Sequence, residues 1–346
     1  MSIFAKWSEA ALPGVRQSFQ DLATAGPVST ESLFLEAHLV GPLPVDVLQI
    51  DGRDRVRFLH AMLSNDIVLL DKAGPGHGVR ATLNSVQGRL VADAHIYLVD
   101  GEKKTGHMLG LFERGASAAF VEMLDKYVIA EKVYFEVTDH VAFAVVGPGA
   151  GAALASAGAA LPEEGEHRHC ASNLGDVEVT VIRRDLGVPE SFVLVGPAEA
   201  ADALAAALGL PSATPAQLEA ARIESALPRP GGDVTSLNIV LEGGLKDRAV
   251  SFTKGCYIGQ EVICRLDSIG TPARLLVQLQ ADVAPAPGTE LFNGGKNVGY
   301  VTSAVQSARL GGGVFLGYVK KRSNEVGMTL AVGEAGGPEA TIRAHV

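Results

Sequence analysis

Short apolar runs separated by turn-forming residues cover the first third of the chain. The run Val45 to Ile50 has the length and apolar character of a strand, and Asp51-Gly52 after it are typical turn residues. The next apolar residues recur at the spacing of one helix face, at Val56, Phe58, Leu59 and Met62. Three strands and a helix are predicted downstream, over 79–83, 88–99, 105–111 and 114–124. This order favours an α+β fold over alternating β-α-β units.

The second half of the chain continues with strands and then changes character. Strands are predicted over 133–137, 141–146, 177–183 and 192–195, with an Ala-rich helix among them and further helices over 198–208 and 215–226. After Thr271-Pro272 the chain consists of short β runs with glycine turns, over 275–279, 288–291, 297–303 and 314–319. Such runs predict a small antiparallel barrel.

Composition narrows the class of protein. The chain has 346 residues, of which 47% are hydrophobic and 20% are charged, as in ordinary globular proteins. Its formal charge of −10 argues against a nucleic-acid partner or a membrane-surface partner, because both need clustered Lys and Arg. The uncharged run 141–162 is interrupted by Pro148 and several glycines, so we do not expect it to span a membrane. Three cysteines without a CxxC pair favour a reducing compartment, with the cytoplasm as the expected location.

The stretch Lys254 to Glu261, Lys-Gly-Cys-Tyr-Ile-Gly-Gln-Glu, has a composition that core packing does not require. Its two glycines permit sharp turns, which predicts an accessible Cys256 at the tip of a loop. Lys254 and Arg265 supply positive potential that favours the thiolate, the nucleophilic and metal-binding form of cysteine. The alternative is a buried, structural cysteine in a tight turn.

Three other positions attract attention. Asp93 lies in a predicted strand between Ala92 and Ala94, so its carboxylate either faces water or has a dedicated partner. Arg222 and Glu224 do not share one helix face, and an ion pair to another element is the structural alternative for each. The loop 167–170, His-Arg-His-Cys, resembles a metal cluster, but it has no second pair of ligands nearby, and we predict no resident metal site.

The octapeptide 254–261 resembles the signature of the YgfZ-type folate-binding proteins, a branch of the glycine cleavage T-protein (aminomethyltransferase) superfamily. The resemblance extends from about 45 to 319 and includes the barrel segment. It implies a three-domain ring with two mixed α/β, ferredoxin-like domains and a C-terminal antiparallel β-barrel. The first expected domain combines 1–50 with 136–270 and carries the stretch 254–261, which we call the Cys loop. The others are an inserted α+β domain over 51–135 and the barrel over 271–346.

For function, the resemblance implies a tetrahydrofolate-binding accessory protein in iron–sulfur cluster assembly or repair, with tRNA modification among the dependent processes. The expected partners are a reduced folate and iron–sulfur proteins or their assembly machinery. Cys256, Asp93 and Lys254 would carry the chemistry, with Cys256 at the channel mouth as a transient ligand of iron or sulfur. Cofactor binding would fall to Asp93, Arg222, Glu242, Tyr257 and Gln260.

The second hypothesis is an aminomethyltransferase that moves a one-carbon unit to tetrahydrofolate. The family's catalytic Asp falls on Asp93 and a second acidic position on Glu242, which supports it. Against it, Ala92 replaces the first family Asp, and an ungapped comparison places Phe192 where T-proteins have a pterin-contacting Glu. Cys256 also counts against it. A folate binder with a purely structural Cys256 is the third hypothesis.

Overall fold

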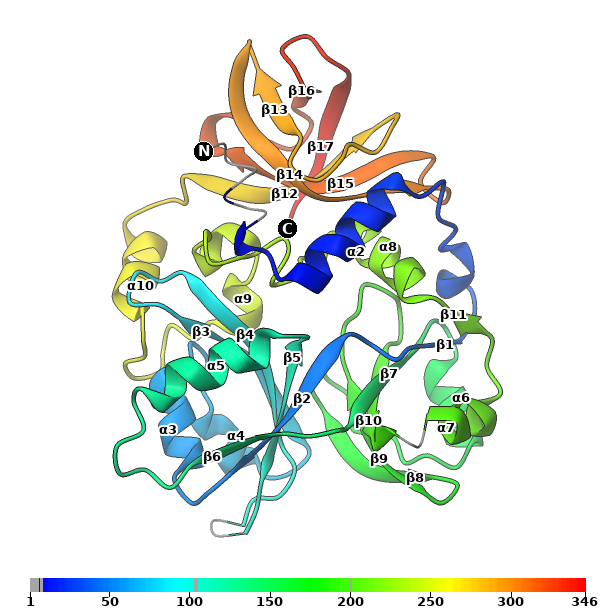
Figure 1. Cartoon of the computed structure of the whole chain (residues 1–346), viewed down its shortest axis with the longest axis vertical. Helices are drawn as coiled ribbons and strands as arrows, with labels where there is room; N and C mark the ends of the chain where they lie inside the picture. The colour runs from blue at the N-terminus through cyan, green and yellow to red at the C-terminus, as the bar shows by residue number, and fades with distance from the viewer. Residues whose placement is uncertain (1–5, 7–8, 103–104, 199–200) are drawn as a thin grey trace.

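The computed structural model describes residues 6, 9–102, 105–198 and 201–346. Three sheets form the fold, and each has its own apolar core. Figure 1 shows the barrel at one end and two open sheets beside each other at the other end. A further apolar cluster joins the two open sheets, because Val47, Leu109 and Leu111 of one pack with Ala142 and Ala144 of the other.

The first open sheet has five strands in the order β3-β4-β5-β2-β6, and all its pairings are antiparallel. Its strands are β2 (Val45–Asp51), β3 (His77–Asn84), β4 (Leu90–Leu98), β5 (Met108–Glu113) and β6 (Tyr134–Val137). Its helices are α3 (Arg55–Met62), α4 (Val68–Ala73) and α5 (Ala116–Asp125). Backbone pairing holds β2 and β6 in this sheet, so the expected domain boundaries at 50/51 and 135/136 cut through two of its strands. The domain division itself stays a prediction.

The second open sheet has six strands in the order β11-β1-β7-β10-β9-β8. They are β1 (His38–Val40), β7 (Val141–Val146), β8 (His169–Leu174), β9 (Val177–Arg183), β10 (Phe192–Gly196) and β11 (Ser212–Ala213). The helices α6 (Ala150–Ser156) and α7 (Ala201–Leu208) accompany it. Strand β8 begins inside the segment that resembled a metal loop, and His169 and Leu174 on it are buried. Within the described residues, no group of three or more His, Cys, Asp or Glu could hold a metal ion.

The closed barrel confirms the predicted C-terminal architecture. Its order is β12-β15-β14-β13-β16-β17, formed by β12 (Arg274–Ala281), β13 (Glu290–Asn293), β14 (Lys296–Ser307), β15 (Gly312–Lys320), β16 (Thr329–Val332) and β17 (Glu339–His345). Gly294 and Gly295 form the β13–β14 hairpin turn as expected, with Asn293 paired to Lys296. Strands β16 and β17 were not predicted, although they close the barrel.

The remaining elements connect the three sheets. They are α2 (Pro13–Thr24), α8 (Pro215–Glu224), α9 (Lys246–Ala249), α10 (Gln260–Ser268), and the 3-10 turns η1 (Glu31–Phe34), η3 (Val240–Gly243) and η4 (Lys321–Ser323). In Figure 1, α2 and α8 lie between the barrel and the open sheets. Val15 and Phe19 of α2 pack with Ile223 of α8 and with the barrel. Among the helices that the structure describes, none has the length and apolar character needed to cross a bilayer.

Candidate functional site

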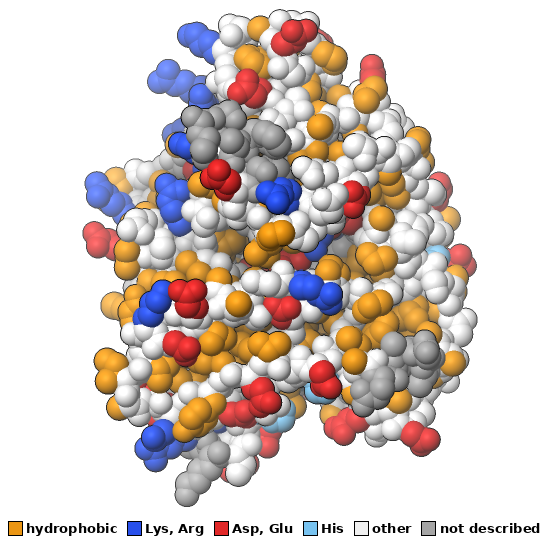
Figure 2. Space-filling model, viewed as in Figure 1, with side chains coloured by type: hydrophobic (Ala, Val, Ile, Leu, Met, Phe, Trp, Pro, Cys, Tyr) orange, Lys and Arg blue, Asp and Glu red, His pale blue; other side chains and the backbone are white. Residues whose placement is uncertain are grey.

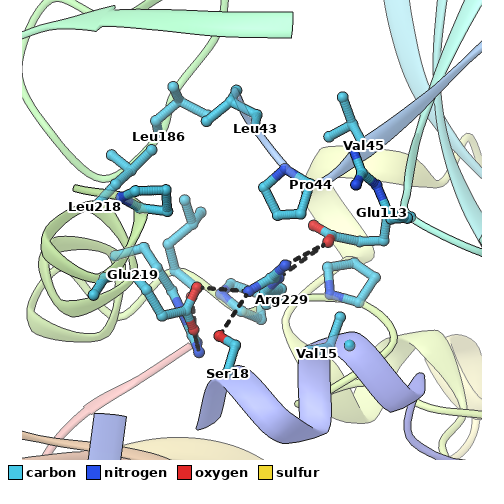
Figure 3. A pocket seen from close by; sticks show the side chains of 18 of the residues that line it. Val15, Ser18, Leu43, Pro44, Val45, Glu113, Leu186, Leu218, Glu219 and Arg229 are labelled. Atoms are coloured by element: carbon cyan, nitrogen blue, oxygen red, sulfur yellow. Dashed lines mark hydrogen bonds and ion pairs between the residues drawn. The ribbon is translucent and has the colours of Figure 1, made fainter. Parts of the chain in front are cut away.

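A cavity of about 710 Å³ lies where the two open sheets meet α2 and α8. Leu43, Leu186 and Leu218 form an apolar side of it, and Glu113, Arg229 and Glu219 form a charged side (Figure 3). Its other lining residues include the polar or charged side chains of Ser18, Asp21, Arg80, His95, Arg114, Glu166, Arg184, Asp185, Arg222 and Arg248. Cavities of this size, mostly apolar with a few placed polar groups, are typical of sites for small organic ligands.

The charged side is a network of paired groups. Arg229 donates to Glu113 Oε2 at 2.8 Å and to Glu219 Oε2 at 3.0 Å. Burial alone would lower the pKa of Arg229, but these two carboxylates raise it above its usual value. Burial by itself would raise the pKa of Glu219, while Arg222 and Arg229 hold it below its usual range. The network therefore keeps its charges and holds this side of the cavity in one arrangement.

Arg222 and Glu224 both pair with other elements, which is the structural alternative considered for them. Arg222 lines the cavity and binds Glu219 and the fully buried Asp233. Asp233 also accepts a hydrogen bond from Ser303 of the barrel at 2.7 Å. Glu224 accepts from Arg309 Nε at 2.8 Å. The two side chains thus join α8 to the barrel.

Asp93 lies on the buried face of β4 and has a dedicated partner. Arg80, on the neighbouring strand β3, donates its Nε to both carboxylate oxygens of Asp93, at 2.9 and 3.2 Å. His95 Nε2 lies 3.4 Å from Asp93 Oδ2. Burial would raise the pKa of Asp93, but Arg80 and His95 lower it below the usual range, so the group stays ionised. Arg80 and His95 line the large cavity, whereas Asp93 lines a second cavity of about 300 Å³ that shares Glu113 with the first.

Behind His95 lies a buried cluster of rings from both open sheets. His95 and Tyr97 of β4 meet His167 and His169, with ring centroids 5.1 to 6.0 Å apart. Burial is the main cause that lowers the pKa of His167 to about 3 and that of His169 to about 4. Both rings are therefore neutral at physiological pH.

The Cys loop presents Cys256 at the surface, as predicted, and the exposed pair Gly255-Cys256 lies between the buried side chains of Lys254 and Tyr257. Lys254 donates to the carbonyl oxygens of Leu63 at 2.6 Å, Asn65 at 3.0 Å and His60. Burial lowers the pKa of Lys254 to about 8. Its ammonium group thus binds the last turn of α3 and the chain just after it, and its predicted effect on the thiol stays a prediction. Lys254 therefore anchors the loop.

Tyr257 and Gln260 of the loop and Glu242 before it were also predicted to bind the cofactor. Tyr257 packs in a core with Leu90 and Ile263, and its ring lies 5.2 Å from Lys254 Nζ. Gln260 is the first residue of α10. Glu242 pairs with Arg274 at 3.3 Å and accepts the backbone N–H of Ile239. None of these three is among the described residues that line the two cavities.

The structure thus brings only part of the predicted site together. Arg222 lines the large cavity and Asp93 the smaller one, while Cys256 is absent from the described lining of both. Cys256 is exposed, and its expected place at a channel mouth stays a prediction. Sequence reasoning missed Arg80, His95, Glu113, Arg184 and Arg229. The one available signal was the run of polar residues at alternate positions in β4, Asp93, His95 and Tyr97, within an apolar strand.

The fold and the barrel define a class of protein with known relatives. The profile of the glycine cleavage T-protein C-terminal barrel domain matches residues 274–346. The glycine cleavage system aminomethyltransferase T of Bartonella henselae has the same fold, with a TM-score of 0.79 and 21% identity over 97% of this chain and 90% of that one. In its fold and in its C-terminal barrel the chain is similar to the glycine cleavage T-protein superfamily.

Relatives in sequence narrow this assignment. The tRNA-modifying protein YgfZ of Yersinia pestis is 28% identical over 76% of this chain and 81% of that protein. A chloroplastic protein of Arabidopsis thaliana, provisionally named a transferase, is 28% identical over 83% of this chain, which spans 66% of that relative's length. This similarity agrees with the resemblance to YgfZ-type members of the superfamily that the Cys loop indicated.

Proposed function

We propose that this protein binds a reduced folate in the large cavity and serves as an accessory factor in iron–sulfur cluster assembly or repair. Cys256 acts as the transient ligand of iron or sulfur on the protein surface. The observation that carries the proposal is the 710 Å³ cavity, whose apolar leucines face a network of fixed charges. A reduced folate has a flat heterocycle, an aromatic linker and carboxylates, and such a lining suits all three.

The geometry of the Cys loop supports the second half of the proposal. Lys254 and Tyr257 are each buried, so they hold the loop while Cys256 between them stays exposed. A single exposed thiol is suited to transfer, since permanent storage of a cluster normally needs four ligands. The separation of Cys256 from the cavity favours a function in which the folate and the thiol act at different surfaces. The YgfZ relative is named as a tRNA-modifying protein.

Folate binding is tested by calorimetry on the full chain with tetrahydrofolate under anaerobic conditions. Leu218→Trp places a large ring on the apolar side of the cavity and should abolish binding. Leu310→Trp, at an exposed position outside the cavity lining, is the matched control and should bind as the wild type does. Equal binding by both variants would show that tetrahydrofolate does not occupy this cavity.

The role of the thiol is tested in a strain that lacks its native copy of the protein. Cys256→Ser should fail to restore the activity of iron–sulfur enzymes and tRNA methylthiolation. Cys264→Ser, which changes a half-buried thiol of α10, should restore both. Full restoration by Cys256→Ser would remove the iron–sulfur role from this loop.

Aminomethyl transfer has weaker support in the site. The carboxylate of Asp93 is held by Arg80 and does not line the large cavity. Phe192, at the position compared with a pterin-contacting Glu, is fully buried in β10. Release of ammonia from a lipoylated carrier with tetrahydrofolate, abolished by Asp93→Ala, would favour the transferase instead.

A further inference from the structure

Arg80 is a buried cation whose Nε is hydrogen-bonded within the protein, whereas its two terminal nitrogens are available to a ligand. Its side chain is 8% exposed, and its Nε donates to Asp93. The terminal nitrogens Nη1 and Nη2 have no hydrogen-bond partner among the residues that the structure describes, and Arg80 lines the large cavity. Five N–H groups in a planar fork make guanidinium the preferred group for two-point recognition of a carboxylate. Asp93 thus orients Arg80 while its terminal pair of donors remains for a ligand.

Arg184, which follows β9, adds a second cation to the lining of the large cavity. The part of the lining formed by Arg80 and Arg184 is called the arginine wall. The guanidinium of Arg184 takes part in no ion pair or side-chain hydrogen bond within the described ranges. Arg80 and Arg184 both act electrostatically on His95 and His167, so the two guanidinium groups lie around the same pair of rings. These rings are neutral and buried, and therefore they add no competing positive charge.

Within the described part of the chain, the carboxylates that line the cavity do not pair with Arg80 Nη1 or Nη2 or with the guanidinium of Arg184, so the arginine wall is available to an anionic ligand. Glu113 and Glu219 are bound by Arg229, and Asp185 lies 3.0 Å from Arg248. Asp21 accepts a hydrogen bond from Gln17 at 2.7 Å, and Glu166 is the remaining acid of the described lining. Glu166 accepts the backbone N–H of Asp185 and is half-exposed, and burial raises its pKa.

We propose that Arg80 and Arg184 form a carboxylate-binding subsite of the large cavity, and that Asp93 is its positioning residue. The inference rests on the proposed function and assigns the subsite to the glutamyl carboxylates of the reduced folate. Asp93 therefore acts on the ligand through Arg80. The ligand meets the N–H donors and positive charge of the two arginines and does not meet the carboxylate of Asp93.

The test compares tetrahydrofolate with tetrahydropteroate, which lacks the glutamyl group, by calorimetry on the full chain. The wild type should bind tetrahydrofolate more tightly, by about tenfold or more, because tetrahydropteroate lacks the glutamyl carboxylates that accept the charge-assisted hydrogen bonds. Arg184→Ala should remove about tenfold of the tetrahydrofolate affinity and leave tetrahydropteroate unchanged. Since Arg80→Gln alone would leave Asp93 buried and unpaired, Arg80→Gln is combined with Asp93→Asn. Arg343→Ala, at an exposed position in β17, is the control.

The ratio of the two affinities separates recognition from a structural role, since a change in cavity shape affects both ligands. Equal affinities in the wild type, or equal weakening of both ligands in the variants, would overturn the subsite while folate binding stands. Failure of both ligands to bind the wild type would overturn the proposed function and the subsite with it.

Discussion

The two glycines of the Cys loop should respond very differently to alanine. Gly259 has φ +82°, and a Cβ there would lie 2.4 Å from the carbonyl oxygen of Ser85 in the β3–β4 turn. The left-handed conformation costs a side chain about 1–2 kcal/mol, and overpacking against backbone adds about 1–3 kcal/mol. We therefore expect Gly259→Ala to lower the free energy of unfolding by about 2–5 kcal/mol.

Gly255 is the matched control in the same loop. A Cβ at this position meets no atom within 4 Å, and its φ lies outside the left-handed region. Gly255→Ala should therefore change stability by less than about 1 kcal/mol, because the folded chain accommodates the methyl group without strain.

Urea unfolding of the two variants, compared with the wild type, measures the difference. A second assay follows the rate at which a thiol reagent labels Cys256 in a background of Cys170→Ser and Cys264→Ser. Gly259→Ala should alter this rate, because the loop must leave its contact with the β3–β4 turn. Equal unfolding midpoints for the two alanine variants would refute the reasoning about how this loop is held.

Three further predictions concern buried ionisable groups. Lys254→Met leaves three carbonyl oxygens without their donor and should lower the free energy of unfolding in urea by about 2–4 kcal/mol. Lys320→Met, the control, loses one surface hydrogen bond and should lower it by less than about 1 kcal/mol. Similar losses in the two variants would contradict the anchoring role of Lys254. His167 and His169 have lowered pKa values of about 3 and 4, so their contribution to stability is complete above the unfolded pKa near 6.5 and is lost as pH falls below it. These two rings should therefore make unfolding near pH 5.5 need about 3 kcal/mol less than near pH 7.5, and replacing both by Gln should reduce the pH dependence by that amount. An unchanged pH dependence would contradict this reasoning. Arg229→Gln leaves Glu113 without its ion-pair partner and should lower stability by about 3–5 kcal/mol and abolish tetrahydrofolate binding; unchanged binding would exclude the charged side of the cavity.

The order of elements was readable from the sequence because periodicity is a local property. The strand and helix from Val45 to Met62, the hairpin at Gly294-Gly295 and the barrel character of the last quarter all agree with the structure. The accessible Cys256 was predicted for the same reason, since a glycine-rich turn needs little information from the rest of the chain. The family resemblance depended on that loop too, and the relatives confirm it.

Contacts made by side chains could not be read in this way. Lys254 precedes Cys256 by two residues, yet its ammonium group binds carbonyl oxygens about 190 residues earlier in the chain. Of the two glycines, only Gly259 is required by the backbone, because only its side of the loop touches the β3–β4 turn. In both cases the decisive neighbour comes from a distant segment.

By itself, then, the sequence determined the α+β character, the barrel, the family resemblance and the exposed thiol, all of which depend on local pattern. The tertiary structure alone decided that Asp93 faces Arg80 and that the cavity is lined by Arg80, Arg184, Arg229 and their neighbours. These residues come from separate strands, loops and helices, so their spacing along the chain does not predict which of them come into contact. These charged side chains come to lie around one cavity only when the three sheets assemble.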